Sequence, residues 1–111
     1  MARPEPPYTA VIFSSLYSDA DEQGYATAAA RMSELAAQQD GYLGHESARG
    51  TDGFGITVSY WRDAEAASAW KAVAEHAEVQ RLGRERWYRG YVVRVATVER
   101  QYAAGEALSA D

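Results

Sequence analysis

Hydrophobic positions along this chain change their period several times, and each change predicts a different element. Short runs rich in β-branched and aromatic residues, bounded by polar turns, predict four strands: Tyr8–Tyr17, Tyr42–Arg49, Phe54–Trp61 and Tyr91–Gln101. Elsewhere apolar residues recur at steps of three and four, which predicts helices. One stripe contains Tyr25, Ala28, Ala29, Met32, Leu35 and Ala36, and the other contains Ala66, Trp70, Val73 and Ala77.

Capping residues predict where the helices begin and end. Asp19, with Glu22 three residues later, has the spacing of a capping box, and Gly41 can close the first helix in the left-handed conformation. Asp63 is the expected cap of the second helix. A shorter helical piece, Glu78–Arg86, is expected to end before Gly90.

The predicted order is βαββαβ, an α+β fold of the ferredoxin-like kind in which two helices cover one face of a four-stranded sheet. The strands Phe54–Trp61 and Tyr91–Gln101 do not alternate cleanly between apolar and charged residues. Both faces of the sheet are therefore expected to be at least partly buried. We predict a homodimer whose two sheets form a barrel-like core, and the alternative is a monomer with an apolar open face.

The chain has 111 residues, which suits one domain over residues 8–102. Residues 1–7, with three prolines, are expected to form an extended arm, and residues 103–111 a flexible tail. The formal net charge of −5 argues against nucleic acid or anionic membrane as a partner. The chain contains no cysteine, signal peptide or bilayer-length apolar run, so we expect a cytoplasmic protein.

Trp70 and His76 are the first candidates for chemistry. Trp70 lies on the buried stripe of its helix, where it is either a core anchor or one wall of a pocket for a planar ligand. His76 lies about 120° further round the helix, at the edge of the stripe. It could shuttle a proton or simply suit the end of a helix. His45 has no obvious partner and is expected to face solvent.

Polar groups within the strands give a second set of candidates. Glu46 is expected to pair with Arg94 or Arg62, either as an ion pair between strands or subunits or as a carboxylate base. The segment 83–91 combines three arginines with three aromatic residues, including Trp87. It is predicted to form an interface seam or the mouth of a pocket. Dinucleotide, phosphate-loop, metal and serine-hydrolase motifs are missing.

Several of these residues together resemble the antibiotic biosynthesis monooxygenase family. The resemblance extends over about residues 8–102 and rests on Gly41–Gly44, Glu46–Ser47, Ser59–Trp61, Trp70–Lys71, His76, Arg84–Tyr88, Tyr91, Arg94, Val98–Arg100 and Tyr102. Membership implies a dimeric α/β barrel of ferredoxin-like subunits, in agreement with the strand pattern. Some members oxidise phenols or quinols with O2 and without metal or flavin, and others degrade haem.

The resemblance implies a cofactor-independent monooxygenase acting on a small electron-rich aromatic substrate. His76 and Trp70 would be catalytic, and the substrate would contact Phe13, Glu46, Ser59, Tyr60, Trp61, Trp87 and Arg94. No metal is expected. Haem is disfavoured, because the haem-degrading branch has a histidine ten residues after the helical tryptophan, where this chain has Gln80. The alternatives are a non-catalytic dimer that binds a small molecule, and a cyclase or isomerase of the same fold.

Overall fold

The computed structural model describes residues 4–17, 22–80 and 88–106 of the chain. The elements follow the order β1 (Tyr8–Tyr17), α1 (Glu22–Ala37), β2 (Tyr42–Arg49), β3 (Phe54–Trp61), α2 (Ala64–Gln80) and β4 (Tyr88–Val98). The predicted βαββαβ order and the ferredoxin-like α+β fold are confirmed. Within the described ranges, neither helix is long and apolar enough to cross a membrane.

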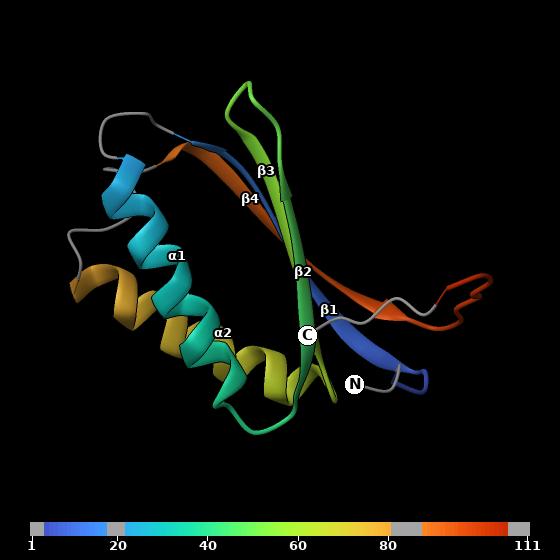
Figure 1. The fold of residues 1–111 in the computed structure, drawn as a ribbon. Helices are drawn as coiled ribbons and strands as arrows, with labels where there is room; N and C mark the ends of the chain where they lie inside the picture. Colours follow the sequence, from blue (N-terminus) through green and yellow to red (C-terminus); the bar gives the residue numbers. More distant parts are fainter. Residues whose placement is uncertain (1–3, 18–21, 81–87, 107–111) are drawn as a thin grey trace.

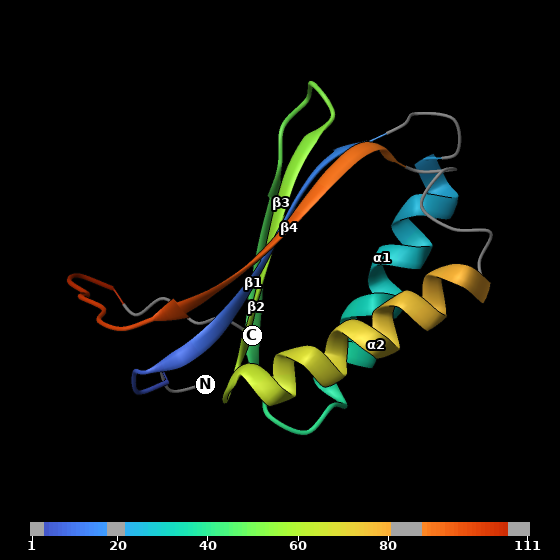
Figure 2. The same ribbon diagram turned by 180° about the vertical axis from the view of Figure 1, so that it is seen from behind.

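The four strands form one antiparallel sheet in the order β2-β3-β1-β4. Both helices lie on the same side of this sheet, and no described helix covers its other side (Figure 1). The view from behind shows the same single helical layer, with β1 and β4 twisting away from it at one end (Figure 2). The two sides are called the helix face and the open face below.

The first three strands have the predicted bounds, and the last part of the chain differs from the prediction. β4 begins at Tyr88 and ends at Val98, so Gly90 lies inside the strand and does not precede it. The reason is that β1 continues to pair with β4 through Leu16↔Gly90 and, after a register shift, Tyr17↔Tyr88. The separate helical piece expected over Glu78–Arg86 is wrong in its first residues, which belong to α2. The remainder lies outside the described residues, as do Asp19 and the side chains of Tyr25, Ala28 and Ala77.

The core is centred on Trp61, whose side chain is fully buried at the end of β3. It packs with the small residues Ala36 of α1 and Ala66 and Ala67 of α2, and the small size of these alanines lets both helices approach the indole. The ring of Trp70 stacks on that of Trp61, with 5.7 Å between ring centroids and 18° between the planes. Trp70 therefore acts as the core anchor that the helical stripe predicts, although it stays half-buried.

Of two predicted end signals beside this core, the cap at Asp63 is confirmed, whereas Gly41 has the predicted left-handed conformation but lies four residues after the end of α1 and does not close that helix. Gly41 has a φ of 86°, and a Cβ atom there would lie 2.5 Å from the Cβ of Ala66, so this position favours glycine twice over. Asp63 caps α2, because its Oδ1 accepts a hydrogen bond of 2.8 Å from the backbone N–H of Ala66. Together these contacts fix the start of α2 against the end of the sheet.

Strand register assigns every described strand residue to one face. Side chains alternate along a strand, and paired residues share a face. The open face carries Tyr8, Ala10, Ile12, Ser14 and Leu16 of β1, Phe54, Ile56, Val58 and Tyr60 of β3, Val92, Arg94 and Ala96 of β4, and Glu46 and Ala48 of β2. Several of its apolar side chains are more than one-third exposed, namely Leu16, Phe54, Ile56 and Val92. The homodimer remains a prediction, and this surface is where a second sheet would pack.

Candidate functional site

A β-bulge in β2 decides which side chains of this strand face the helices. Tyr42 pairs with Trp61, and Gly44 pairs with the next residue of β3, Tyr60, so Leu43 is an extra residue. Gly44 has a φ of 145°, which suits glycine at such a position. Because of the extra residue, Tyr42 and His45 lie on the same face although they are three positions apart.

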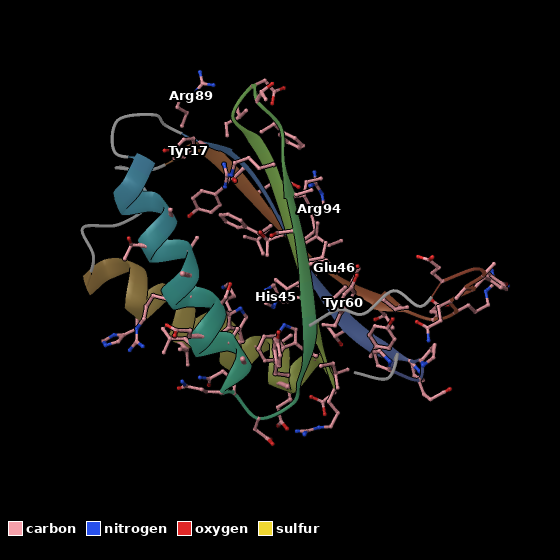
Figure 3. The ribbon with its side chains drawn as sticks, in the orientation of Figure 1. Tyr17, His45, Glu46, Tyr60, Arg89 and Arg94 are labelled. Atoms are coloured by element: carbon pink, nitrogen blue, oxygen red, sulfur yellow. The ribbon has the colours of Figure 1, made fainter. Side chains whose placement is uncertain are left out.

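His45 lies on the helix face and has a partner, so its predicted solvent-facing position is wrong. The hydroxyl of Tyr42 lies 2.6 Å from Nδ1 of His45. This hydrogen bond engages Nδ1 and fixes the orientation of the ring. Nε2 is then the ring nitrogen that can exchange a proton with a bound molecule. Figure 3 shows His45 on the side of β2 that faces the helices. The side chain is half-buried, which leaves part of the ring accessible.

Aromatic rings connect His45 to the core. The ring of Tyr42 meets that of Trp61 edge to face, with centroids 5.7 Å apart and planes at 73°. The indole Nε1 of Trp61 donates a 2.8 Å hydrogen bond to Oγ of Ser59, which is buried. Since Ser59 pairs with His45 across the strands, the rings and the hydroxyl hold one rigid surface beside the imidazole.

The helix face of the sheet divides into a polar half and an apolar half. We call this surface the strand floor and define it by His45 and Ser47 of β2, Thr57 and Ser59 of β3, Val11 and Phe13 of β1, and Val93 and Val95 of β4. Phe13 contacts the ring of Tyr91, with 5.4 Å between centroids. Although they lie on the helix face, Val93 is 41% and Val95 60% exposed. The described parts of the helices therefore leave the β4 side of the strand floor accessible.

The sheet separates the predicted site residues into two groups. Phe13, Ser59 and Trp61 lie on the helix face, where Trp70 of α2 joins them. The other predicted residues of the strands, Glu46, Tyr60 and Arg94, lie on the open face. Figure 3 shows Glu46 and Tyr60 on the opposite side of β2 from His45. Within one chain the two groups cannot line one cavity.

Two further predicted residues lie away from the strand floor or outside the described structure. His76 is exposed, and it lies off the half-buried stripe of α2 that contains Trp70 and Val73. Its part in catalysis remains a prediction. Trp87 lies outside the described residues. Within those residues, histidine and acidic side chains do not gather in groups of three that could hold a metal ion.

Glu46 has a tyrosine partner in place of the predicted arginine. The hydroxyl of Tyr60 donates a 2.6 Å hydrogen bond to Oε1 of Glu46. Burial raises the pKa of Tyr60 above its ordinary value, and the hydrogen bond to the Glu46 carboxylate raises it further, so the phenol stays a donor. Arg62 instead contacts Asp40 at 3.0 Å, and this contact lowers the pKa of the Asp40 carboxyl. The expected pair between Glu46 and Arg62 is therefore wrong.

The sequence is similar to a known protein family and to a curated bacterial protein. The profile of the family described as antibiotic biosynthesis monooxygenase matches residues 7–82. The uncharacterized protein YqjZ of Bacillus subtilis (strain 168) is 54% identical over 98 residues, which are 88% of this chain and 85% of the relative.

Two solved structures share the fold. SnoaB, a cofactor-independent oxygenase from Streptomyces nogalater, superposes with a TM-score of 0.64 at 14% identity over 91% of this chain and all of that chain (100%). Rv0793 from Mycobacterium tuberculosis superposes with a TM-score of 0.65 at 19% identity over 86% of this chain and 99% of that chain. At these identities the likeness extends to the fold alone.

Proposed function

Because the chain belongs to the antibiotic biosynthesis monooxygenase family, we propose that it is a monooxygenase that oxidises a small electron-rich aromatic molecule with O2. The substrate class is a phenol or quinol, and the reaction uses neither metal nor flavin. The fold shared with the cofactor-independent oxygenase SnoaB supports this class of reaction. The curated relative YqjZ is uncharacterized, so it adds support for the family and none for a substrate.

The observation that carries the proposal is the division of the strand floor. Val93 and Val95 offer an accessible apolar surface on which a flat ring can lie. His45, Ser47, Thr57 and Ser59 line the other half, and a phenolic oxygen directed toward them meets an imidazole. Pockets that bind small molecules combine such apolar area with a few polar groups that fix orientation.

The proposed oxidation requires a base and a surface from which water is excluded. A base removes the phenolic proton, and the electron-rich anion then reacts with O2. One oxygen atom enters the ring as a carbonyl and the other leaves as water, so a phenol becomes a quinone. All four electrons come from the substrate. A histidine near neutral pH suits the proton transfer.

Two imidazoles are candidates for the base. His45 is our first choice, because the hydrogen bond to Tyr42 orients it on the strand floor. His76 on the exposed side of α2 is the second. Trp70, stacked on Trp61, would form one wall of the substrate site. Phe13 would lie beneath the ring of the substrate.

The working form we propose is a homodimer, as the resemblance implies. The exposed apolar side chains of the open face, Leu16, Phe54, Ile56 and Val92, support it because soluble monomers rarely expose a large apolar patch. In such a dimer, Tyr60 and Arg94 would lie between the two sheets. They would then contribute to the contact between subunits, and they would not contact a substrate bound to the helix face.

The proposal is tested by measuring O2 uptake with a panel of naphthols and hydroquinones. We expect uptake with some members, and a loss of about 100-fold or more in His45→Ala if that imidazole is the base. His76→Ala is the matched variant, and if it alone abolishes uptake, His76 is the base. Uptake no faster than in buffer across the panel contradicts the monooxygenase. Substrate loss without O2 identifies a cyclase or isomerase, and binding without turnover a binding protein.

A further inference from the structure

One row of residues across the open face carries opposite charges at its two ends. Glu46 of β2 pairs with Val58 of β3, Val58 pairs with Ile12 of β1, and Ile12 pairs with Arg94 of β4. The row therefore runs from an acid through two apolar residues to a base, and it spans the full width of the sheet. All four side chains leave the same face.

Within one chain the two charged ends are too far apart to pair. Three strand spacings separate them, which is about 14 Å along the row, and side chains stand roughly perpendicular to a sheet. Tyr60 also holds the Glu46 carboxylate through Oε1, beside the strand from which it projects. Oε2 of the same carboxylate can accept a hydrogen bond from a second donor above the sheet.

A second copy of the chain supplies that donor if its sheet packs face to face on the first. A two-fold axis that runs along the strands, between β3 and β1, exchanges the two ends of the row. We propose that Glu46 of one subunit pairs with the partner's Arg94, and Arg94 with the partner's Glu46, so that each dimer contains two such ion pairs. This inference rests on the homodimer proposed above.

The same row explains why this orientation is preferred. A two-fold axis perpendicular to the strands through the row would place Glu46 over a second Glu46 and Arg94 over a second Arg94, and such like-charge contacts are unfavourable. With the axis along the strands, both charge contacts become attractive, and Val58 and Ile12 meet the partner's Ile12 and Val58. Apolar contact then provides the affinity, and the two pairs provide the orientation.

The experiment is a charge exchange followed by measurement of the dimer dissociation constant by analytical ultracentrifugation. Glu46→Arg and Arg94→Glu each place like charges together, so each alone should raise the dissociation constant about tenfold or more. The double variant E46R/R94E restores two attractive pairs and should return to within a few-fold of the original protein. Arg31→Glu changes the charge by the same amount as Arg94→Glu but lies exposed on α1, on the other side of the sheet, so it should leave the dimer unchanged.

Each failure has its own signature. If the unaltered protein sediments as a monomer at all concentrations, the homodimer is wrong and the inference fails with it. If the unaltered protein is a dimer but the double variant is no better than the single variants, the pairing alone is wrong. Circular dichroism of each variant checks that it folds, and the rescue by the second substitution cannot come from a chain that has lost its fold. The O2 uptake test is separate from both outcomes.

Discussion

Replacing Trp61 with phenylalanine should destabilise the protein through two effects that can be separated. The first is loss of part of a fully buried ring that packs against Trp70 and Tyr42. Truncating a buried tryptophan to alanine costs about 3–5 kcal/mol, and phenylalanine retains much of that packing. The second is the loss of the donor to Ser59 Oγ, which leaves a buried hydroxyl without its partner at a cost of about 1–3 kcal/mol.

Together the two effects should lower the free energy of unfolding by about 2–4 kcal/mol. A domain with a stability of about 5–15 kcal/mol stays folded after such a loss. At about 4 °C per kcal/mol for a chain of this size, the melting temperature should fall by about 8–16 °C. Urea unfolding followed by far-ultraviolet circular dichroism measures the change. The protein concentration must be the same for all variants, because dimer formation would shift the midpoint.

Ser59→Ala separates the two effects. In the original protein it leaves the indole N–H unpaired and should cost about 1–3 kcal/mol. In Trp61→Phe it removes a hydroxyl that has already lost its donor, so it should be neutral or restore about 1 kcal/mol. Tyr102→Ala is the control, since Tyr102 is 85% exposed and its loss should stay within about 0.5 kcal/mol.

Two results would refute this account of the core. One is a Trp61→Phe protein whose free energy of unfolding lies within about 0.5 kcal/mol of the original value, because removing a fully buried indole from the centre of the core should cost more than that. The other is an equal cost of Ser59→Ala in both backgrounds, which would mean that the hydrogen bond between the two side chains contributes nothing.

Two other perturbations test single features of the fold. Because the pKa of Tyr60 is raised in the folded state, the stability from its phenol is fully present below about pH 10 and is lost as the pH rises further. Tyr60→Phe should therefore flatten the fall in melting temperature above about pH 10, and an unchanged slope would count against the raised pKa. Gly41→Ala should lower the free energy of unfolding, measured in urea, by about 1–3 kcal/mol or more, because of the positive φ at this position and its close approach to Ala66. Gly105→Ala, also at positive φ but with no atom within 4 Å, should cost less, and equal costs would exclude the contact as a cause.

The fold was predictable because its signals are local. Strand runs between polar turns gave the bounds of β1, β2 and β3, and the left-handed turn at Gly41 and the cap at Asp63 depend on single residues. The start of β4 was not predictable in the same way. In the sequence alone, Gly90 suggests that the strand begins after it. Pairing with β1 extends β4 across Gly90 to Tyr88.

The candidate site was only partly predictable, because it depends on which way each strand side chain points. Simple alternation from Tyr42 places His45 on the opposite face, whereas the extra residue at Leu43 returns it to the same face. The spacing of an aromatic and a histidine by three residues, with a glycine between them, is the signal that could have suggested a bulge. The pairing of Tyr60 with Glu46 needed the register of β2 against β3, which alternation within one strand does not supply.

The extra residue in β2 has a consequence for how this protein can change over time. A strand without it would turn the imidazole of His45 outward and bring the carboxylate of Glu46 inward, so a single deletion would exchange the two groups between the faces. Point substitutions further along the strand can change the helix face, where we place catalysis, and the open face, where we place the subunit contact, separately, since neighbouring residues serve opposite faces. A one-residue change in length at this place alters both faces together, so we expect insertions and deletions to be far less tolerated here than in the turn between β2 and β3.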